Sequence, residues 1–271
     1  MLELEGVTLS YDSGSGSPVR ALNGIDLRIA AGEFVTVVGS NGAGKSSLIK
    51  VISGAARPSS GSVRIDGGDV TRQPEYRRAA RIARVFDNPH AGTLPELSIE
   101  DNMALAMSRG RRRRLRFAVT RARRETMRER LAVLQLGLEE RLRDSVGLLS
   151  AGQRQSLTMV MAGLCEPEVL LLDEHLAALD PATQARTLEL TVSLAGRLSA
   201  ATLMVTHNMQ HAIDVGSRLL VMSRGRIVAD IRDAEKRGLT VDGLVDRITG
   251  AGGVVSDRAL LRDDAMTERL S

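Results

Sequence analysis

The sequence predicts an α/β fold built on a mainly parallel β-sheet, and three observations support this prediction. The run at residues 169–172 is continuously apolar and therefore predicts a strand at the centre of a parallel sheet, and residues 202–206 predict a further buried strand. A third run, residues 33–38, leads directly into a glycine-rich loop and then into a helical pattern. A strand-rich start and a helix-rich stretch at about 97–147 predict an antiparallel β-layer and an inserted helical subdomain beside this core.

The glycine-rich loop, residues 39–47, has the pattern G-x-x-x-x-G-K-[ST] of a phosphate-binding loop. Its glycines allow backbone N–H groups to approach a polyphosphate, and the helix predicted over 47–52 adds the positive end of its dipole. We expect Lys45 to contact the β- and γ-phosphates and the Ser46 hydroxyl to bind Mg²⁺. A chance glycine-rich turn is the alternative, and the complete motif with its flanks argues against it. The predicted phosphate-binding residues are Ser40, Asn41, Gly42, Ala43, Gly44, Lys45, Ser46 and Ser47.

Alternating apolar residues predict two strands at the start of the chain, one ending at Tyr11 and the other at about 22–29. A Gly/Ser turn at 12–18 separates them. We expect Tyr11 to lie where an adenine ring can stack on it, with Val19 packed nearby. The alternative is that Tyr11 only caps an edge of the core, and spacing alone leaves both interpretations open.

The middle of the chain predicts two more strands and then helices. Residues 62–66 form the first strand, and residues 81–86 form the second, which ends at Asp87. Ser98 followed by Asp101 is a helix-capping sequence, and apolar residues recur at helical spacing after it.

An arginine-rich segment, residues 109–130, lies within this helical stretch. Three interpretations are open: a solvated helix face, a surface close to anionic lipid headgroups, or a patch that binds nucleic acid. Phe117 is the one aromatic residue there, which argues against base stacking, and we expect no nucleic-acid partner.

Polar residues that could act on a phosphate follow the predicted strands. Asp173 and Glu174 end the strand at 169–172, and His207 ends the strand at 202–206. A carboxylate here can hold Mg²⁺ through water, and a second can polarise an attacking water molecule. Because ligands of α/β folds bind at the carboxyl ends of the strands, we expect these side chains to share one edge with the glycine-rich loop.

Two further helix starts carry polar residues. Ser150 and Gly152 precede a helix predicted over 155–165, where the N-terminus could bind an anion. Asp180 and Pro181 begin another helix, with proline at a favoured first-turn position.

The last part of the chain predicts a hairpin, 219–222 with 226–230, and a helix over 240–248. Glycines at 250–253 suggest a hinge before a charged tail. We therefore predict one domain over residues 1–250, followed by a tail at 251–271. Within the domain, residues 1–87 and 166–250 form the core and β-layer, and residues 88–165 form the helical subdomain.

Composition narrows the class of protein. Aromatic residues make up 2% with no Trp, so the core consists of Val, Leu, Ile, Ala and Met, and the single Cys165 excludes an internal disulfide. The first residues lack the features of a signal peptide, and no apolar run approaches the roughly 20 residues that span a bilayer. We expect a soluble protein, or one that meets a membrane only through a partner.

Five motifs follow one another along the chain: residues 39–47, 149–153, 169–174, 178–180 and His207. Together they closely resemble the ATP-binding-cassette (ABC) ATPases, and the sequence LSAGQ at 149–153 carries most weight because other phosphate-loop ATPases lack it. The resemblance covers roughly residues 1–248 and implies a P-loop NTPase core.

By this resemblance the cofactors are ATP and Mg²⁺. Tyr11 stacks on adenine, and Asp173 holds Mg²⁺ through water. Glu174 is the general base or the carboxylate that orients the attacking water, and His207 contacts the γ-phosphate. Ser150, Gly152 and Gln153 contact the ATP that is bound to the other protomer, and the Asp180 loop crosses the same interface. Hydrolysis then requires a head-to-tail homodimer with two ATP molecules between the protomers.

The motifs narrow the resemblance to ATPase components of bacterial importers described as putative tryptophan/tyrosine-type uptake systems. This implies an integral-membrane permease as partner, a substrate-binding protein as an indirect one, and a location on the cytoplasmic face of the membrane. Two other functions remain open: a soluble ABC ATPase of a non-transport assembly system, such as cofactor assembly, and a binding module that does not hydrolyse ATP.

Three positions depart from the family pattern. Asp87 replaces the usual Gln, and we expect it either to contact Mg²⁺ more closely or to weaken coupling to the permease. Ala151 for Gly and Leu176 for a polar residue are milder changes.

Overall fold

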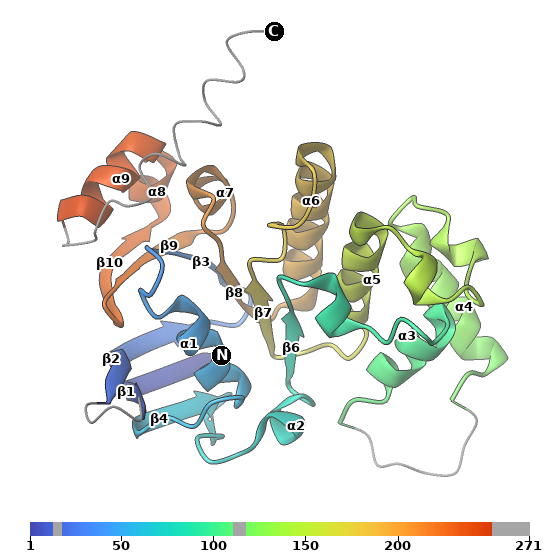
Figure 1. The fold of residues 1–271 in the computed structure, drawn as a ribbon, viewed down its shortest axis with the longest axis horizontal. Helices are drawn as coiled ribbons and strands as arrows, with labels where there is room; N and C mark the ends of the chain where they lie inside the picture. Colours follow the sequence, from blue (N-terminus) through green and yellow to red (C-terminus); the bar gives the residue numbers. More distant parts are fainter. Residues whose placement is uncertain (13–17, 111–117, 251–271) are drawn as a thin grey trace, which may run out of the picture.

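A computed structural model describes residues 1–12, 18–110 and 118–250 of the chain, and these residues form two β-sheets (Figure 1). The larger has the strand order β10-β9-β3-β8-β7-β6, and the smaller has the order β2-β1-β4-β5. The strands are β1 (Leu2–Tyr11), β2 (Val19–Ile29), β3 (Phe34–Val38), β4 (Ser60–Ile65), β5 (Gly68–Asp69), β6 (Ile82–Val85), β7 (Val169–Asp173), β8 (Ala201–Val205), β9 (Arg218–Ser223) and β10 (Arg226–Arg232).

Parallel pairing fixes the polarity of the larger sheet. In this sheet β3 pairs in parallel with β8 and β9, β7 pairs in parallel with β8, and β6 pairs in parallel with β7. Among its described strands, β10 alone is antiparallel to its neighbour. The residues of β3, β7 and β8 are all buried, as the continuous apolar runs predict. The carboxyl ends of β3, β8, β7 and β6 therefore lie along one edge.

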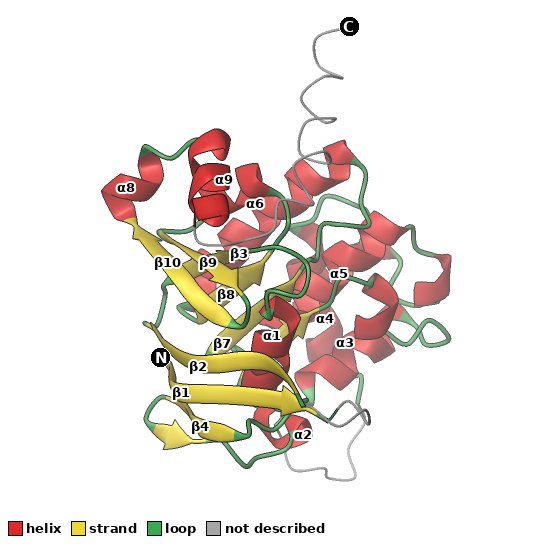
Figure 2. Ribbon diagram, turned by 60° about the vertical axis from the view of Figure 1, so that its left-hand side comes forward, coloured by secondary structure: helices red, strands yellow, loops and turns green. Residues whose placement is uncertain are grey.

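Helices cover both faces of the larger sheet. The helices are α1 (Lys45–Ser53), α2 (Glu75–Arg78), α3 (Ile99–Met107), α4 (Arg121–Ala132), α5 (Ala151–Gly163), α6 (Pro181–Leu198), α7 (Met209–Asp214), α8 (Asp233–Arg237) and α9 (Val241–Gly250), with 3₁₀ turns η1 (Pro89–Gly92), η2 (Leu138–Glu140) and η3 (Val146–Leu148). α1 lies between the two sheets, and one apolar core joins it to both (Figure 2). A second core packs α5 and α6 against the opposite face of β6, β7 and β8.

The predicted helical subdomain contains α3, α4 and α5, which share a core of their own. Ser98 caps α3 as predicted, since its Oγ accepts a hydrogen bond from the Asp101 N–H at 3.1 Å. α4 carries much of the arginine-rich segment on a mostly exposed surface, with Met127 and Leu131 as its buried residues.

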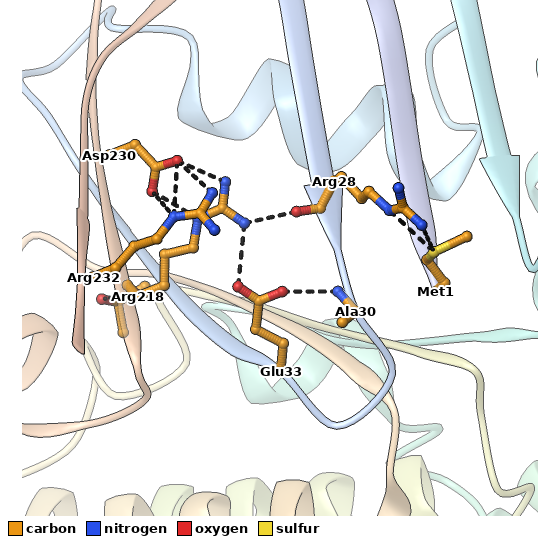
Figure 3. A network of polar contacts seen from close by, with 8 residues as sticks. Met1, Arg28, Ala30, Glu33, Arg218, Asp230 and Arg232 are labelled. Carbon is orange, nitrogen blue, oxygen red and sulfur yellow. Dashed lines mark hydrogen bonds and ion pairs between the residues drawn. The ribbon is translucent and has the colours of Figure 1, made fainter.

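One buried arginine joins the two sheets (Figure 3). Arg218 of β9 donates to both carboxylate oxygens of Asp230 at 2.7 and 2.9 Å, and to the backbone carbonyl of Arg28 on β2 at 2.6 Å. It also donates to Glu33 at 3.2 Å, whose other oxygen accepts from the Ala30 N–H at 2.8 Å. Such bidentate, charge-assisted contacts fix the geometry of the junction.

The α/β fold predicted from the sequence is confirmed, while two helices begin earlier in the structure than the sequence predicts. α1 begins at Lys45 rather than at 47, because Gly44 takes the left-handed conformation that precedes the helix. α5 begins at Ala151 rather than at 155, because Ser150 is its cap. The predictions that concern residues 13–17, residues 111–117 with their arginines and Phe117, and the tail at 251–271 lie outside the described residues.

Candidate active site

The carboxyl edge of the larger sheet brings together residues from four separate parts of the chain. β3 leads into the glycine-rich loop, β8 into His207, β7 into Asp173 and Glu174, and β6 into Asp87. Since the spatial order of these strands is β3-β8-β7-β6, the loop lies at one end of this row and Asp87 at the other. This is the position where open α/β sheets bind ligands.

Two glycines of the loop occupy places that no other residue fits. A Cβ at Gly39 would lie 2.3 Å from the backbone oxygen of Met222, and a Cβ at Gly44 would lie 2.6 Å from that of Ala21. Gly44 also has φ +103, a conformation that L side chains rarely adopt. The loop is thereby held between the β9–β10 hairpin and β2, with its backbone exposed to a ligand.

Lys45 is the first residue of α1 and is buried, while the next residue, Ser46, is exposed. The Lys45 ammonium donates to the backbone oxygens of Gly39 at 2.6 Å and Ser40 at 3.2 Å. These bonds hold the lysine across its own loop, where its charge faces the space that a phosphate would enter.

Asp173 closes β7 with a buried carboxylate that is paired to an arginine. Arg84 of β6 donates from Nη2 to Asp173 Oδ2 at 2.8 Å. Burial raises the pKa of Asp173, the Arg84 hydrogen bond and charge oppose this rise, and the charges of Asp87 and Glu174 add to it. Arg84 was not among the residues expected from the sequence.

Glu174 stands in a strained backbone conformation beside His207. Its φ is +47, in the left-handed region that is uncommon for residues with a side chain. The Glu174 N–H donates to the Val205 carbonyl at 3.0 Å, which ties the residue to the end of β8. Glu174 Oε2 then lies 3.4 Å from His207 Nδ1, and both side chains are accessible at the edge of the sheet.

The segment after Glu174 is anchored by a buried histidine. His175 Nε2 lies 2.9 Å from Thr191 Oγ1 of α6, and Leu176 packs into the core that joins α6 to the sheet. Burial lowers the pKa of His175 to about 3, and His211 adds to this shift, so the ring is neutral. Leu176, one of the three departures from the family pattern, is therefore a core residue here.

Tyr11 and Val19 face each other at the ends of β1 and β2. Tyr11 is 41% exposed and Val19 is 59% exposed. This exposure argues against Tyr11 as a cap on the core edge and leaves its ring available to stack on a planar ligand.

Ser150 is the cap of α5, and Gly152 and Gln153 lie in its first turn; Figure 1 shows α5 to the right of β6. Ser150 Oγ accepts from the Gln153 N–H at 3.2 Å, and Gln153 Oε1 accepts from the Ser150 N–H at 3.1 Å. This capping box leaves the Ser150 O–H and the Gln153 side-chain N–H groups with capacity to donate to a ligand. α5 contacts the segment that follows β6 through Gln155 and Phe86, and β8 and β7 lie between β6 and β3, which leads into the loop.

Gly152 has a packing role that the sequence did not reveal. A Cβ at this position would lie 2.6 Å from Thr183 Cγ2, on the first turn of α6. The cap of that helix is Asp180, whose Oδ1 accepts from the Thr183 N–H at 3.1 Å. The starts of α5 and α6 are thus packed against each other.

α5 also contacts the segment that carries Asp87. Gln155 Nε2 donates to the Phe86 carbonyl at 3.3 Å, and the Arg154 guanidinium contacts the His90 ring. Asp87 itself is exposed between these two contacts. Neither contact could be predicted from the sequence, because Phe86 and His90 are more than 60 residues away from their partners on α5.

The donor set suits Mg²⁺ shared with a nucleotide. In the described ranges, which leave out 13–17, 111–117 and 251–271, no group of three or more His, Cys, Asp or Glu side chains gathers to form a metal cage. Mg²⁺ needs only one or two protein ligands when phosphates and water complete its shell. The Ser46 hydroxyl and the Asp173 carboxylate are oxygen donors of this kind.

This edge therefore combines a phosphate-binding loop, a lysine ammonium and a carboxylate beside a histidine, and the smaller sheet adds an exposed aromatic ring at the end of β1. These parts can bind a nucleoside polyphosphate and orient water against its terminal phosphate.

Comparisons with known proteins agree with this chemistry. A family model described as "ABC transporter" matches residues 22–177. The chain is 38% identical over 247 residues to a tyrosine transport ATP-binding protein of Clostridioides difficile, covering 91% of this chain and 98% of that protein. It is 35% identical over 240 residues to a methionine import ATP-binding protein of Chromohalobacter salexigens, covering 86% of this chain and 65% of that protein.

A solved structure of similar fold is the dimeric post-hydrolysis state of the ATP-binding cassette MJ0796 bound to ADP and Pi. Its TM-score is 0.74 at 26% identity, covering 88% of this chain and all of that one. Among the described residues of our chain, no helix has the length and apolar character needed to cross a membrane.

Proposed function

The chain belongs to the ABC transporter family of ATP-hydrolysing proteins, and we propose that it is the ATPase subunit of a bacterial importer that works with a separate membrane permease. The observation that carries this proposal is the split of the site. The loop at 39–47, Glu174 and His207 share one edge, whereas Ser150 and Gly152 begin α5, which contacts the segment after β6. A single chain therefore holds two different halves of a nucleotide site.

On this proposal, ATP lies along the carboxyl edge with adenine on Tyr11 and its phosphates over α1. The backbone N–H groups of 40–47 and the dipole of α1 bind the phosphates, and Lys45 neutralises part of their charge. Ser46 and Asp173 hold Mg²⁺, with Asp87 near enough to take part, and the ion supplies further charge neutralisation when bound.

The pair Glu174 and His207 performs the chemistry at the terminal phosphate. Glu174 accepts a proton from, or orients, the attacking water. His207, 3.4 Å from that carboxylate, contacts the γ-phosphate and fixes the position of Glu174. The strained backbone of Glu174 aims its side chain at the edge, and the bond to Val205 holds it there.

The second half of each site comes from another copy of the chain. Ser150, Gly152 and Gln153 present the N-terminus of α5, an anion-binding end with the Ser150 O–H free to donate. In a head-to-tail dimer this end meets the phosphates bound to the partner, and the Asp180 loop crosses the same interface. ATP then closes the dimer, and hydrolysis allows it to open.

The permease contact lies on the helical subdomain. Leu94 and Leu105 are 48% and 53% exposed and line one shallow pocket of about 200 Å³ together with Asn102 and Met161. Exposed apolar side chains that gather in this way mark protein interfaces. Because η1 and α5 connect this surface to Asp87, movement of the permease reaches the nucleotide through this segment.

The named relatives suggest an amino-acid solute, with tyrosine as the first to test, delivered to the permease by a substrate-binding protein. The cassette sits at the cytoplasmic face of the membrane, held there by the permease. The alternative, a soluble ABC ATPase of an assembly system, predicts that no integral-membrane protein co-purifies with the chain.

The first test is dimerisation of the Glu174→Gln variant, measured by size exclusion with and without ATP and Mg²⁺. This variant removes the water-activating carboxylate and keeps the shape of the side chain, so ATP persists in the site. We expect a dimer only when ATP is present, and Ser150→Ala in the same background should weaken it. A monomer under every condition would contradict the split-site proposal.

A further inference from the structure

The pairing of Arg84 with Asp173 places a resident cation on the carboxylate that, in the proposed function, holds Mg²⁺. Arg84 lies on β6 opposite Leu171 of β7, which directs its side chain along the sheet toward the end of β7. Its Nη2 reaches Asp173 Oδ2 at 2.8 Å, and the two side chains are only 16% and 11% exposed. A partly buried ion pair of this kind is screened little by solvent.

Phe86 holds the guanidinium in place. Arg84 lies on β6, and Phe86 is the first residue after that strand, two positions further along the chain. The Arg84 Cζ lies 4.5 Å from the centre of the Phe86 ring, within the range of a cation–π contact. The Phe86 carbonyl in turn accepts from Gln155 of α5, so the stacking partner is itself anchored.

The charges that face Asp173 make Arg84 necessary when no nucleotide is bound. Glu174 follows Asp173 directly and Asp87 follows Arg84 by three residues, and both add negative charge around it. Removing a cation from a buried carboxylate leaves an uncompensated charge, which is strongly unfavourable.

We propose that Arg84 is a counter-ion that competes with Mg²⁺ for Asp173 and so sets the Mg²⁺ concentration at which the nucleotide site is filled. This inference rests on the proposed function, since it assumes that Asp173 is the carboxylate that holds Mg²⁺. Arg84 acts here through Asp173 as a positioning residue and takes no part in the chemistry. Asp173 is thus occupied by a cation at every stage, first the guanidinium and then the metal.

Arg81 provides a matched control on the same strand pair. It precedes β6 and donates from Nε to both carboxylate oxygens of Glu168 at 2.8 and 2.9 Å, at the opposite ends of β6 and β7 from Asp173. Arg81→Gln therefore removes the same kind of cross-strand ion pair without touching the carboxyl edge.

The test measures binding of a fluorescent, non-hydrolysable ATP analogue to the full chain while free Mg²⁺ is varied from EDTA to saturation. Arg84→Gln should lower the Mg²⁺ concentration at half-maximal binding by about three- to tenfold, the range expected for loss of a partly buried ion pair. In EDTA the same variant should bind the analogue more weakly than wild type, because a cation near the phosphates is lost. Arg81→Gln should match wild type in both measurements.

A midpoint for Arg84→Gln within about twofold of wild type, or one that rises, overturns the competition. If Arg84→Gln does not fold, Arg84→Lys keeps the charge but loses the stacked, forked geometry, and its midpoint should fall by about two- to threefold; an unchanged midpoint then overturns the inference. If wild type itself binds the analogue without any Mg²⁺ dependence, the proposed metal site fails, and this outcome is distinct from failure of the Arg84 inference.

Discussion

Acidification should destabilise the chain through His175, the buried residue next to Glu174. The ring is 1% exposed, and its Nε2 is hydrogen-bonded to Thr191, while its Nδ1 has no partner among the described residues. Burial lowers the pKa of His175 in the folded chain to about 3, whereas an unfolded chain has the ordinary value of about 6.5. At pH values between these two pKa values, His175 is therefore protonated in the unfolded chain and neutral in the folded chain.

The direction and size of the change in unfolding free energy with pH follow from this difference in pKa. The stabilising contribution is complete above about pH 6.5 and is lost progressively as the pH falls toward 3. At pH 5.5, one unit below the unfolded pKa, the loss is about 1.4 kcal/mol, and at pH 4.5 it is about 2.7 kcal/mol. Because His175 anchors the segment after Glu174 to α6, we expect this loss also to loosen the backbone of Glu174, the carboxylate that we propose orients the attacking water.

Urea unfolding of wild type and His175→Gln at a series of pH values between 7.5 and 4.5 measures this effect. Glutamine can keep the bond to Thr191 but does not titrate, so the difference in unfolding free energy between the two proteins isolates the histidine. We expect wild type to lose about 1.4 kcal/mol more than the variant between pH 7.5 and 5.5. Parallel pH profiles for the two proteins would refute the reasoning.

Three other substitutions test contacts described above. Arg218→Met should lower the unfolding free energy, measured in urea, by about 2–3 kcal/mol, because it leaves Glu33 and Asp230 without the cation that they share. The loss stays in this range because both carboxylates keep some solvent access. Arg218→Lys should recover less than half of the loss. Gly152→Ala should destabilise the nucleotide-free chain by about 1–3 kcal/mol in thermal unfolding through its clash with Thr183, and a second change, Thr183→Ser, should restore most of this; no rescue would contradict the packing role. Asp87→Gln should change the Mg²⁺ dependence of the ATPase rate, and an unchanged rate and Mg²⁺ dependence would show that the carboxylate has no special role.

Local sequence signals predicted most of the fold. The apolar run at 169–172 predicted β7, and the mostly apolar residues at 202–206 predicted β8, since a strand covered on both faces needs no alternation. The motif at 39–47 predicted a strand, loop and helix in the correct order. The roles assigned to Tyr11, Asp173 and His207 remain predictions, because they depend on a bound nucleotide.

Contacts across strands and helices could not be predicted, because they depend on register. Arg84 reaches Asp173 only because β6 and β7 pair with Arg84 beside Leu171, and nothing local to either residue specifies this. The sequence predicts that Gly152 contacts a phosphate, but it does not indicate that the residue packs closely against Thr183 of α6. The segments at α2, α7 and α8 are four to six residues long, too short for a helical period to emerge from the sequence.

The charges at this edge affect how ATP and Mg²⁺ change each other's affinity for the site. Asp87, Asp173 and Glu174 oppose a bare triphosphate, while Lys45 and Arg84 oppose a bare divalent cation. Each ligand reduces the repulsion that the other meets, so the two should bind with positive coupling, and by linkage ATP should raise the affinity for Mg²⁺ by the factor that Mg²⁺ raises the affinity for ATP. Because Arg84 leaves Asp173 only when the metal replaces it, the coupling measured in Arg84→Gln should reveal how much of this reciprocity one guanidinium controls.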